Sequence, residues 1–414
     1  MERLIFHVDV NSAFLSWEAA RLVNEGNEDI RLIPSAIGGE RDRRTGVILA
    51  KSIAAKQYGV KTGEPVSLAL RKCPQLYIAK PDFSLYERCS RKFMDICREY
   101  APVVEKYSID ECFLDMSGTS MIYPDPIKVA YEIKEEIKKR LNFTVNVGVG
   151  SNKLLAKMAS DFEKPDKVHT LFSCEIEKKL WPLPVRDLFT VGAATADKLE
   201  RACIKTVGEL AALDINILRS LVGVKLGEQL HMFANGIDNS AVLEQQDAAK
   251  GYSNSTTLEQ DVVSPEDAYR ILLALADTTA SRMRADGVRA YCIGVSVRSN
   301  DFKDRSHQKK LIEATDITAD IFKHCKQLFD ELWDKKTPLR LLGISLTNLT
   351  SDEDAQLSFF GSEERNEKAR AVDKALDAIR SKYGIDTISR GAYGAAPRIG
   401  KKHKAQMQNK NEDK

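Results

Sequence analysis

The chain has 414 residues, of which 43% are apolar, and its formal net charge is only +2. This length allows three or four small domains with real cores, and the near-neutral charge means that nucleic-acid binding must rest on local patches. The eight cysteines lack zinc-site spacing, no stretch is long and apolar enough to cross a membrane, and Asp9 interrupts any signal peptide, so we expect a soluble cytoplasmic protein with reduced thiols.

The first 165 residues alternate strand-like and helix-like patterns. We expect strands at 4–10, 103–109, 112–116 and 143–149, helices at 14–23, 86–100 and 127–141, and a helix that Ser151 could cap and that ends near residue 161. The stretch 24–75 is mixed and loop-rich, with a basic segment at 51–61. Hairpin pairing of strands favours an α+β fold with a mixed or antiparallel sheet over a doubly wound one.

The pattern changes after residue 165. From about 170 to 240 we expect short helices broken by glycine at 191–195 and 222–227. After a polar linker, helices at 265–286 and 316–333 and strands at 291–298 and 340–346 indicate a separate α/β domain. A last helix over 363–383 places Val372, Leu376, Ile379 and Tyr383 at helical spacing, and the basic, polar end at 398–414 is typical of disorder.

Three acids are placed where buried strands end. Asp9 lies at the end of the first strand, and Asp110 and Glu111 lie between two β-rich runs. Because an unpaired buried carboxylate is strongly disfavoured, divalent cations are a natural compensation, and two Mg²⁺ ions about 4 Å apart can drive phosphoryl chemistry. The alternative is that Asp9 caps the next helix and the other two acids lie on a solvated turn.

Two stretches resemble the signature motifs of Y-family DNA polymerases. They are residues 6–14 (Phe-His-Val-Asp-Val-Asn-Ser-Ala-Phe) and 107–115 (Tyr-Ser-Ile-Asp-Glu-Cys-Phe-Leu-Asp), and the resemblance extends over 1–350, including 152–161, 164–165 and 253–257. It implies a palm at 1–23 and 76–167, small fingers at 24–75, a helical thumb with helix-hairpin-helix-like turns at 168–241, a linker at 242–255, an α/β little finger at 256–348 and a tail at 349–414.

The resemblance also implies roles for single residues. Asp9, Asp110, Glu111 and the backbone carbonyl of Val10 match the ligands of two Mg²⁺ ions, for which Mn²⁺ is expected to substitute. Phe14, beside Ala13, matches a steric gate that excludes ribose, although its ring alone could be core packing.

Lys164 and Lys56 match positions that contact the nucleotide's triphosphate. Lys56 stands where the polymerase IV branch has arginine, and Ile53 stands where that branch has tyrosine, so the fingers are more similar to the UmuC-type branch. A lysine cannot make arginine's bidentate fork. Lys56 could also be an ordinary surface lysine.

Two further features indicate DNA binding. Gly192 and Gly223 lie in the glycine-broken turns, where free backbone N–H groups can hold a phosphate. The stretch 282–311 has eight Lys and Arg against three Asp, an excess of 8 − 3 = +5. Within it we expect Ser296, Arg298, Lys303 and Arg305 to meet the DNA backbone, in a salt-dependent way. The alternative is a solvated basic face.

The segment 356–360 resembles the sliding-clamp-binding peptide of bacterial polymerases, with Gln356, Leu357, Phe359 and Phe360 as its contacts. Exposed apolar side chains after an acidic stretch need a partner groove. This segment could instead dock on the protein's own surface, and the helix that follows could bind a partner or cover the little finger.

The resemblance predicts a monomeric DNA-directed DNA polymerase for lesion bypass, which transfers nucleotides from dNTPs to a primer 3′-OH on template DNA with low fidelity and no proofreading. Two alternatives remain at this point. A nucleotidyl cyclase also uses a palm-like sheet with two metal-binding acids, and a non-catalytic DNA- and clamp-binding factor could carry the acids for structural reasons.

Overall fold

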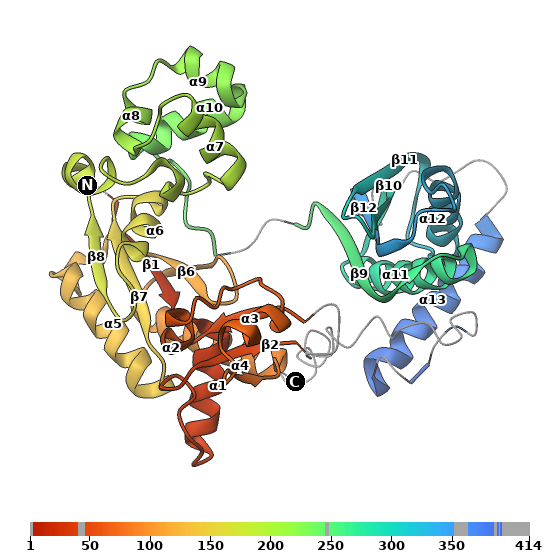
Figure 1. Ribbon diagram of the computed structural model, residues 1–414, viewed down its shortest axis with the longest axis horizontal. Helices are drawn as coiled ribbons and strands as arrows, with labels where there is room; N and C mark the ends of the chain where they lie inside the picture. Colours follow the sequence, from red (N-terminus) through yellow and green to blue (C-terminus); the bar gives the residue numbers. More distant parts are fainter. Residues whose placement is uncertain are drawn as a thin grey trace. The chain divides into compact units, whose positions relative to one another are not determined.

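The computed structural model describes residues 3–39, 46–244, 248–351, 363–384, 387–388 and 390. The chain divides into two compact units (Figure 1). We call them the first unit, within residues 1–38 and 47–246, and the second unit, made mainly of residues 247–414. None of the described helices is long and apolar enough to span a membrane.

A five-stranded mixed sheet forms the centre of the first unit, in the order β5-β6-β1-β7-β8. Its strands are β1 (Ile5–Val10), β5 (Val103–Lys106), β6 (Glu111–Asp115), β7 (Val145–Gly150) and β8 (Val168–Leu171). Only β7 and β8 pair in parallel, and β1 lies between β6 and β7, antiparallel to both. The expected hairpin, mixed sheet and α+β class are confirmed.

Helices cover both faces of this sheet. Alternate residues of β1 and β7, such as Phe6, Val8 and Val147, are fully buried in a core shared with α1 (Ala13–Asn24), α4 (Phe83–Tyr100) and α5 (Pro126–Leu141). The opposite face carries α6 (Lys153–Asp161). Asn152 caps α6 by accepting from Leu155 N, so our expectation that Ser151 is the cap was wrong: the helix begins one residue later.

The stretch 24–75 is more ordered than its mixed composition predicts. A small sheet in the order β3-β2-β4 packs with two short helices around its own core. Its elements are β2 (Ser35–Gly38), β3 (Ile48–Lys51), α2 (Ile53–Gln57), α3 (Val66–Lys72) and β4 (Tyr77–Ala79). Each element is at most seven residues long, which is too short for a clear periodic pattern.

Short helices after β8 pack around another core, to which α6 contributes Leu155 and Met158. These helices are α7 (Ala193–Arg201), α8 (Val207–Ala211), α9 (Ile215–Val222) and α10 (Val224–Ala234). Three single helical turns precede them, namely η2 (Ser173–Glu175), η3 (Ile176–Leu180) and η4 (Val185–Asp187). A further turn, η1 (Thr119–Met121), lies earlier in the chain, before α5. The expected helices broken by glycine are confirmed at Gly192 and Gly223.

The second unit is a four-stranded antiparallel sheet in the order β11-β10-β12-β9, with α11 and α12 packed on one face (Figure 1). Its elements are β9 (Gly251–Val262), α11 (Pro265–Ala285), β10 (Val288–Ser299), β11 (Asp304–Thr315), α12 (Thr318–Leu332) and β12 (Leu339–Ser351). Both strands that the sequence did not predict, β9 and β11, are edge strands. Half-exposed edge strands do not need a repeating apolar face. The linker expected at 242–255 was too long, since β9 begins at Gly251.

Helix α13 (Glu363–Tyr383) belongs to the second unit. Its contacts differ from those that its apolar spacing indicates: Asp373 and Arg380 are buried, whereas Val372 and Tyr383 are exposed. Arg284 of α11 pairs with Asp377 at 2.7 Å, and Arg370 pairs with Asp316 at 2.8 Å. The helix therefore covers the second unit through a charged face.

Candidate active site

The three acids predicted from the sequence lie together on the five-stranded sheet. Asp9 and Glu111 are directly opposite each other across the β1–β6 pair. Asp110 is joined to the same place because its carbonyl accepts the N–H of Val10 at 2.9 Å. Asp9 lies on the sheet face that α6 covers, because His7, two residues earlier on β1, contacts Ser160 of α6. Glu111 shares this face because directly opposite residues of paired strands point the same way.

Each acid has its own hydrogen-bonding partners. Lys164 forms ion pairs with Asp9 and, at 2.7 Å, with Asp161. Lys157 donates to Glu111 Oε2 at 2.6 Å, and Ser108 Oγ donates to Asp110 at 2.6 Å. The cluster is thus held by two lysines from α6 and the segment after it.

These contacts perturb the carboxylates in opposite ways. Burial raises the pKa of Asp9, helped by the nearby Asp110 charge and opposed by Lys164. Burial also acts to raise the pKa of Glu111, but hydrogen bonds from His7 and Lys157 outweigh it and lower that pKa to about 2. Glu111 is therefore a carboxylate at every physiological pH.

The donor set suits a hard divalent cation. Carboxylate oxygens are the ligands that Mg²⁺ prefers, and a cation would relieve the cost of burying Asp9 beside Asp110. Among the residues that the structure describes, no group of three or more His, Cys, Asp or Glu converges as a finished metal cage. The acids are brought to one place, and their side chains point to separate partners.

Three residues of this cluster were not found from the sequence. His7, Lys157 and Ser160 connect to Glu111 in a hydrogen-bonded chain. Two signals were available: His7 is two residues before Asp9 on one strand, and Lys157 and Ser160 are three apart on one helix.

Phe14, the predicted gate, is half-buried near the start of α1. Its ring stacks on Tyr86, with centroids 4.7 Å apart and an angle of 24° between the planes. Trp17 and Phe83 meet the same ring edge-on. Ala13 beside it is buried. The ring is thus fixed by aromatic neighbours while part of it stays accessible.

The predicted phosphate contacts differ in their surroundings. Lys56 on α2 is exposed, and Lys51 on β3 lies close enough that burial and then the Lys56 charge lower the pKa of Lys51. Lys51 meets Thr62 Oγ1 at 3.4 Å. Two neighbouring cations favour an anion, and Lys51 is a candidate that the sequence did not single out. Ile53 is 60% exposed.

The two predicted glycines both precede helices. Gly192 and Gly223 are the N-caps of α7 and α10, and neither helix has a side-chain cap. Gly223 has a φ of 92°, which favours glycine, and added Cβ atoms at both positions would meet open space. The first N–H groups of both helices therefore remain available.

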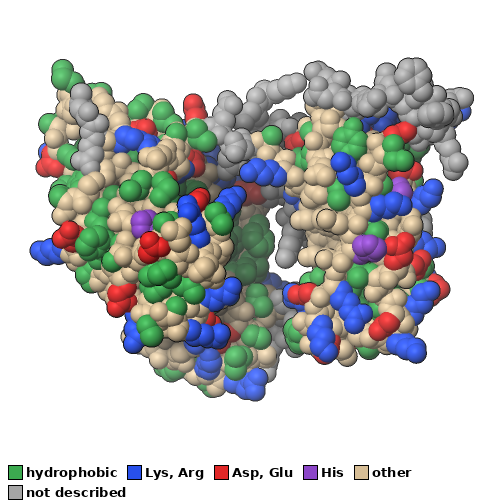
Figure 2. Space-filling view, turned by 90° about the horizontal axis from the view of Figure 1, so that it is seen from above, with side chains coloured by type: hydrophobic (Ala, Val, Ile, Leu, Met, Phe, Trp, Pro, Cys, Tyr) green, Lys and Arg blue, Asp and Glu red, His purple; other side chains and the backbone are tan. Residues whose placement is uncertain are grey.

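The basic residues predicted in the second unit fall into two classes. Arg298 binds Asp304 through two nitrogens at 2.6 and 2.8 Å, and Lys303 pairs with Asp301 at 2.8 Å. Arg284, which we counted in the same basic stretch, is buried against α13 instead. Over the face seen in Figure 2, Lys and Arg are likewise interspersed with acidic side chains.

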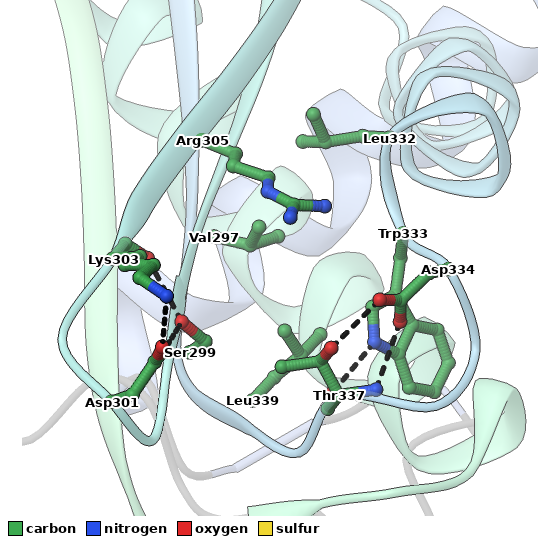
Figure 3. Close-up of a pocket in the computed structure, with 10 residues that line it drawn as sticks. All are labelled: Val297, Ser299, Asp301, Lys303, Arg305, Leu332, Trp333, Asp334, Thr337 and Leu339. Atoms are coloured by element: carbon green, nitrogen blue, oxygen red, sulfur yellow. Dashed lines mark hydrogen bonds and ion pairs between the residues drawn. The ribbon is translucent and has the colours of Figure 1, made fainter.

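Arg305 stands apart from these pairs. Its guanidinium lies over a hollow of about 110 Å³, between Val297 and Leu332, while dashed contacts join Lys303 to Asp301 and Asp334 to Thr337 (Figure 3). Asp334 has its pKa lowered to about 2, mainly by backbone N–H bonds, with a small contribution from Arg305. Ser296 lines a separate, shallow hollow of about 450 Å³ on the sheet face away from α11 and α12. The predicted contacts Gln356, Leu357, Phe359 and Phe360 lie outside the described residues.

Comparison with known proteins identifies relatives along the whole chain. Residues 8–161 match the impB/mucB/samB family, residues 249–359 match that family's C-terminal domain, and residues 186–238 match the thumb domain of DNA polymerase iota. A protein of Clostridium acetobutylicum called DNA polymerase IV is 44% identical over 94% of this chain and 98% of its own. DNA polymerase IV 1 of Bacillus subtilis is 36% identical over 94% of this chain and 93% of its own.

A solved structure shares the fold. A chimeric Y-family DNA polymerase superimposes with a TM-score of 0.73, covering 84% of this chain and all of its own, at 23% sequence identity. The likeness shows that the two proteins share a fold.

Proposed function

This chain belongs to the Y-family of DNA polymerases, and from that premise we propose that it copies primed, damaged DNA through a site built on Asp9, Asp110 and Glu111. The primer 3′-OH attacks the α-phosphate of a dNTP, a new P–O bond forms and pyrophosphate leaves. Family membership favours this reaction over cyclic-nucleotide formation and over a purely structural role for the acids.

One observation supports this assignment above all others. Asp9 and Glu111 are cross-strand partners, and Asp110 is bonded through its carbonyl to the residue after Asp9, so residues a hundred positions apart meet at one point. Two Mg²⁺ ions held there, with help from the Val10 carbonyl, would lower the pKa of the attacking hydroxyl and stabilise the leaving group.

The surrounding residues have distinct proposed roles. Phe14 packs against the sugar and excludes a 2′-OH, because its ring is held by Tyr86 and cannot easily move aside. Lys164 exchanges its contact with Asp9 for the triphosphate, and Lys56 adds a second charge from α2. The bodies around the five-stranded sheet, the three-stranded sheet, the helical region and the second unit would serve as palm, fingers, thumb and little finger.

The duplex would be held by contacts that do not read sequence. The turns at Gly192 and Gly223 present backbone N–H groups, and β10, β11 and the turn between them add contacts from Ser296, Arg298, Lys303 and Arg305. Arg305 should contribute most, because Arg298 and Lys303 must first leave Asp304 and Asp301.

The deciding experiment is extension of a primed template by the purified protein, with Asp110→Asn as the matched variant. We expect Mg²⁺-dependent extension on undamaged and abasic templates, and a loss of at least about 10³-fold in Asp110→Asn with DNA binding retained. If Asp110→Asn extends the primer at the wild-type rate, the assignment of Asp110 to the catalytic metal site is wrong. Phe14→Ala should admit rNTPs at least about tenfold better.

A sliding clamp is a second proposed partner, with Gln356, Leu357, Phe359 and Phe360 as its contacts. We propose that the protein acts as a monomer in the cytoplasm, where the clamp and the chromosome are found. A Leu357→Ala, Phe359→Ala double variant should lose stimulation by the clamp and keep clamp-free extension. Equal stimulation of both proteins would exclude the peptide.

A further inference from the structure

Helix α6 lies unusually close to the sheet. A Cβ added to Gly148 of β7 would lie 1.9 Å from Ala156 O and 2.4 Å from Ser160 N, and one added to Gly150 would lie 2.7 Å from Ala156 N. No real side chain fits at such distances, so the two glycines allow α6 to lie flat on β7. This brings polar side chains of α6 within reach of β1 and β6.

Three side chains on one face of α6 use that proximity. Lys153 binds Glu105 at 2.7 Å, Lys157 binds Glu111 Oε2 at 2.6 Å, and Ser160 Oγ lies 2.8 Å from His7 Nδ1. His7 Nε2 is 3.0 Å from the same oxygen, Glu111 Oε2. The hydrogen bonds from His7 and Lys157 therefore both involve Oε2, one of the two carboxylate oxygens of Glu111.

The direction of the His7 bond follows from hydrogen counting. The carboxylate of Glu111 only accepts, so His7 Nε2 must carry the hydrogen and donate it. In a neutral ring, Nδ1 then accepts from Ser160 Oγ; if Ser160 donates instead to Lys157 O at 2.8 Å, Nδ1 must donate to Ser160 Oγ and the ring is an imidazolium. Both arrangements keep Nε2–H directed at Glu111.

Both donors are held in place by aromatic contacts. The His7 ring is fully buried and lies 4.6 Å from the Phe113 ring. The Lys157 ammonium lies 5.6 Å from the Tyr107 ring and 5.4 Å from the Phe189 ring. Both donors therefore have further contacts that favour their positions beside Glu111 Oε2.

We propose that His7 and Lys157 are positioning residues that immobilise Oε2 of Glu111, so that Glu111 ligates a divalent ion through Oε1 alone. This rests on the proposed function, because it takes Glu111 as a metal ligand. Single-oxygen ligation leaves more of the octahedral shell of Mg²⁺ for phosphate oxygens and water. Substituting a residue that hydrogen-bonds to a metal ligand typically weakens metal binding by about 10- to 100-fold.

Binding of Mn²⁺ tests this separately from catalysis. The sample is the full chain with primer–template DNA, a dideoxy-terminated primer and the matched dNTP, and free Mn²⁺ is counted by electron paramagnetic resonance. We expect His7→Leu and Lys157→Met to raise the half-saturating Mn²⁺ concentration at least about tenfold. His7→Gln retains an N–H donor and should recover most of the loss.

Lys153→Met is the matched control. Lys153 and Lys157 lie on the same helix, their side chains are 13% and 14% exposed, and each pairs with a glutamate. Only Glu111 is a proposed ligand, so Lys153→Met should alter the melting temperature about as much as Lys157→Met and leave Mn²⁺ affinity unchanged.

The outcomes separate the two proposals. If Asp110→Asn weakens Mn²⁺ binding while Lys157→Met and His7→Leu do not, the positioning role is wrong and the metal site stands. If His7→Leu does not fold, comparing the Mn²⁺ affinity of Lys157→Met with that of Lys153→Met decides whether the positioning role is correct. Equal losses in Lys153→Met and Lys157→Met would show a general effect on the fold and would also overturn the inference. Absence of both Mn²⁺ binding and extension in the wild type would refute the metal site itself.

Discussion

Two charged clusters in this protein are built in different ways. Around Asp9 and Glu111, the cations are lysines, and Lys164 is 37% exposed. Between α13 and the helices of the second unit, the cations are arginines, and Arg284 and Asp373 are only 5% and 3% exposed. A lysine is a mobile point charge, whereas arginine's rigid fork holds several partners at once.

This difference between lysine and arginine indicates that the two charged clusters have different roles. Lys164, the more exposed lysine, can exchange partners, as the proposed nucleotide site requires, whereas Lys157 is only 14% exposed. The arginine cluster pairs four carboxylates with four guanidinium groups, namely Asp277, Asp316, Asp373 and Asp377 with Arg284, Arg370, Arg380 and Arg390. These ion pairs attach α13 to its unit.

The largest effect should come from opening the arginine cluster. Arg284→Met removes the arginine that pairs with Asp377 at 2.7 Å and one of the two arginines beside Asp373, and we expect a loss of about 3 kcal/mol in the unfolding free energy of the second unit. Urea denaturation measures it. Arg298→Met breaks an exposed pair and should have no measurable effect. Equal stability of Arg284→Met and wild type would mean that α13 is not held by these charges.

Lys164 of the proposed active site should behave in the reverse way, with a small effect on stability and a larger effect on nucleotide binding. Lys164→Met removes a partly exposed pair, so the melting temperature should change little. The KM for dNTP should rise about tenfold, because a cation for the triphosphate is lost. Steady-state kinetics with one templated dNTP measures this. A large loss of stability with unchanged KM would make Lys164 a structural residue.

Lys72 tests whether a lysine in this protein can also stabilise the fold. It binds the buried Glu64 at 2.5 Å, and although burial acts to raise the pKa of Glu64, bonds from Lys72 and Lys61 lower it below 4.5. A carboxyl whose pKa is lowered by folding stabilises the fold above its unfolded pKa and loses that contribution as pH falls through the folded value.

Lys72→Met should therefore cost about 1–2 kcal/mol at pH 7. The difference from wild type should shrink below pH 4.5. Chemical denaturation at pH 7 and pH 3.5 provides the comparison. A difference that grows on acidification would contradict the assigned direction of the Glu64 pKa.

The smallest effect is on the salt dependence of DNA binding, and it concerns Arg305 and Arg298 of the second unit. Arg305→Ala should reduce the slope of log K against log salt for duplex DNA by about 0.9, the value for one lost phosphate contact. Arg298→Ala should reduce it less, because Arg298 is already bound to Asp304. Fluorescence anisotropy over a range of salt concentrations would show this, and the opposite order would place the duplex differently on β10 and β11.

The sequence predicted those parts of the site that depend on local pattern. The strand ending at Asp9, the hairpin carrying Asp110 and Glu111, and the helix beginning near Phe14 all follow from alternation and spacing, and the structure contains each of them. The structure places the predicted gate, Phe14, against Tyr86, and Gly192 and Gly223 directly before helices; their roles stay predictions.

Other features had no local pattern to reveal them. The strands β9 and β11 lie at the two edges of their sheet, so each pairs with only one neighbouring strand of that sheet. Such strands do not need a strict alternation of apolar and polar residues. The apolar spacing in α13 did not show that Asp373 and Arg380 would be its most buried residues, because their partners Arg284 and Asp277 are distant in the chain.

The sequence by itself determined the three acids, the strands and turns that carry them, and the family, because these depend on residue type and short spacing. Tertiary structure alone decided which partner each acid has. Close packing of α6 on Gly148 and Gly150 brings Lys157 and Ser160 to β1 and β6, and no pattern along the chain encodes how near two elements come.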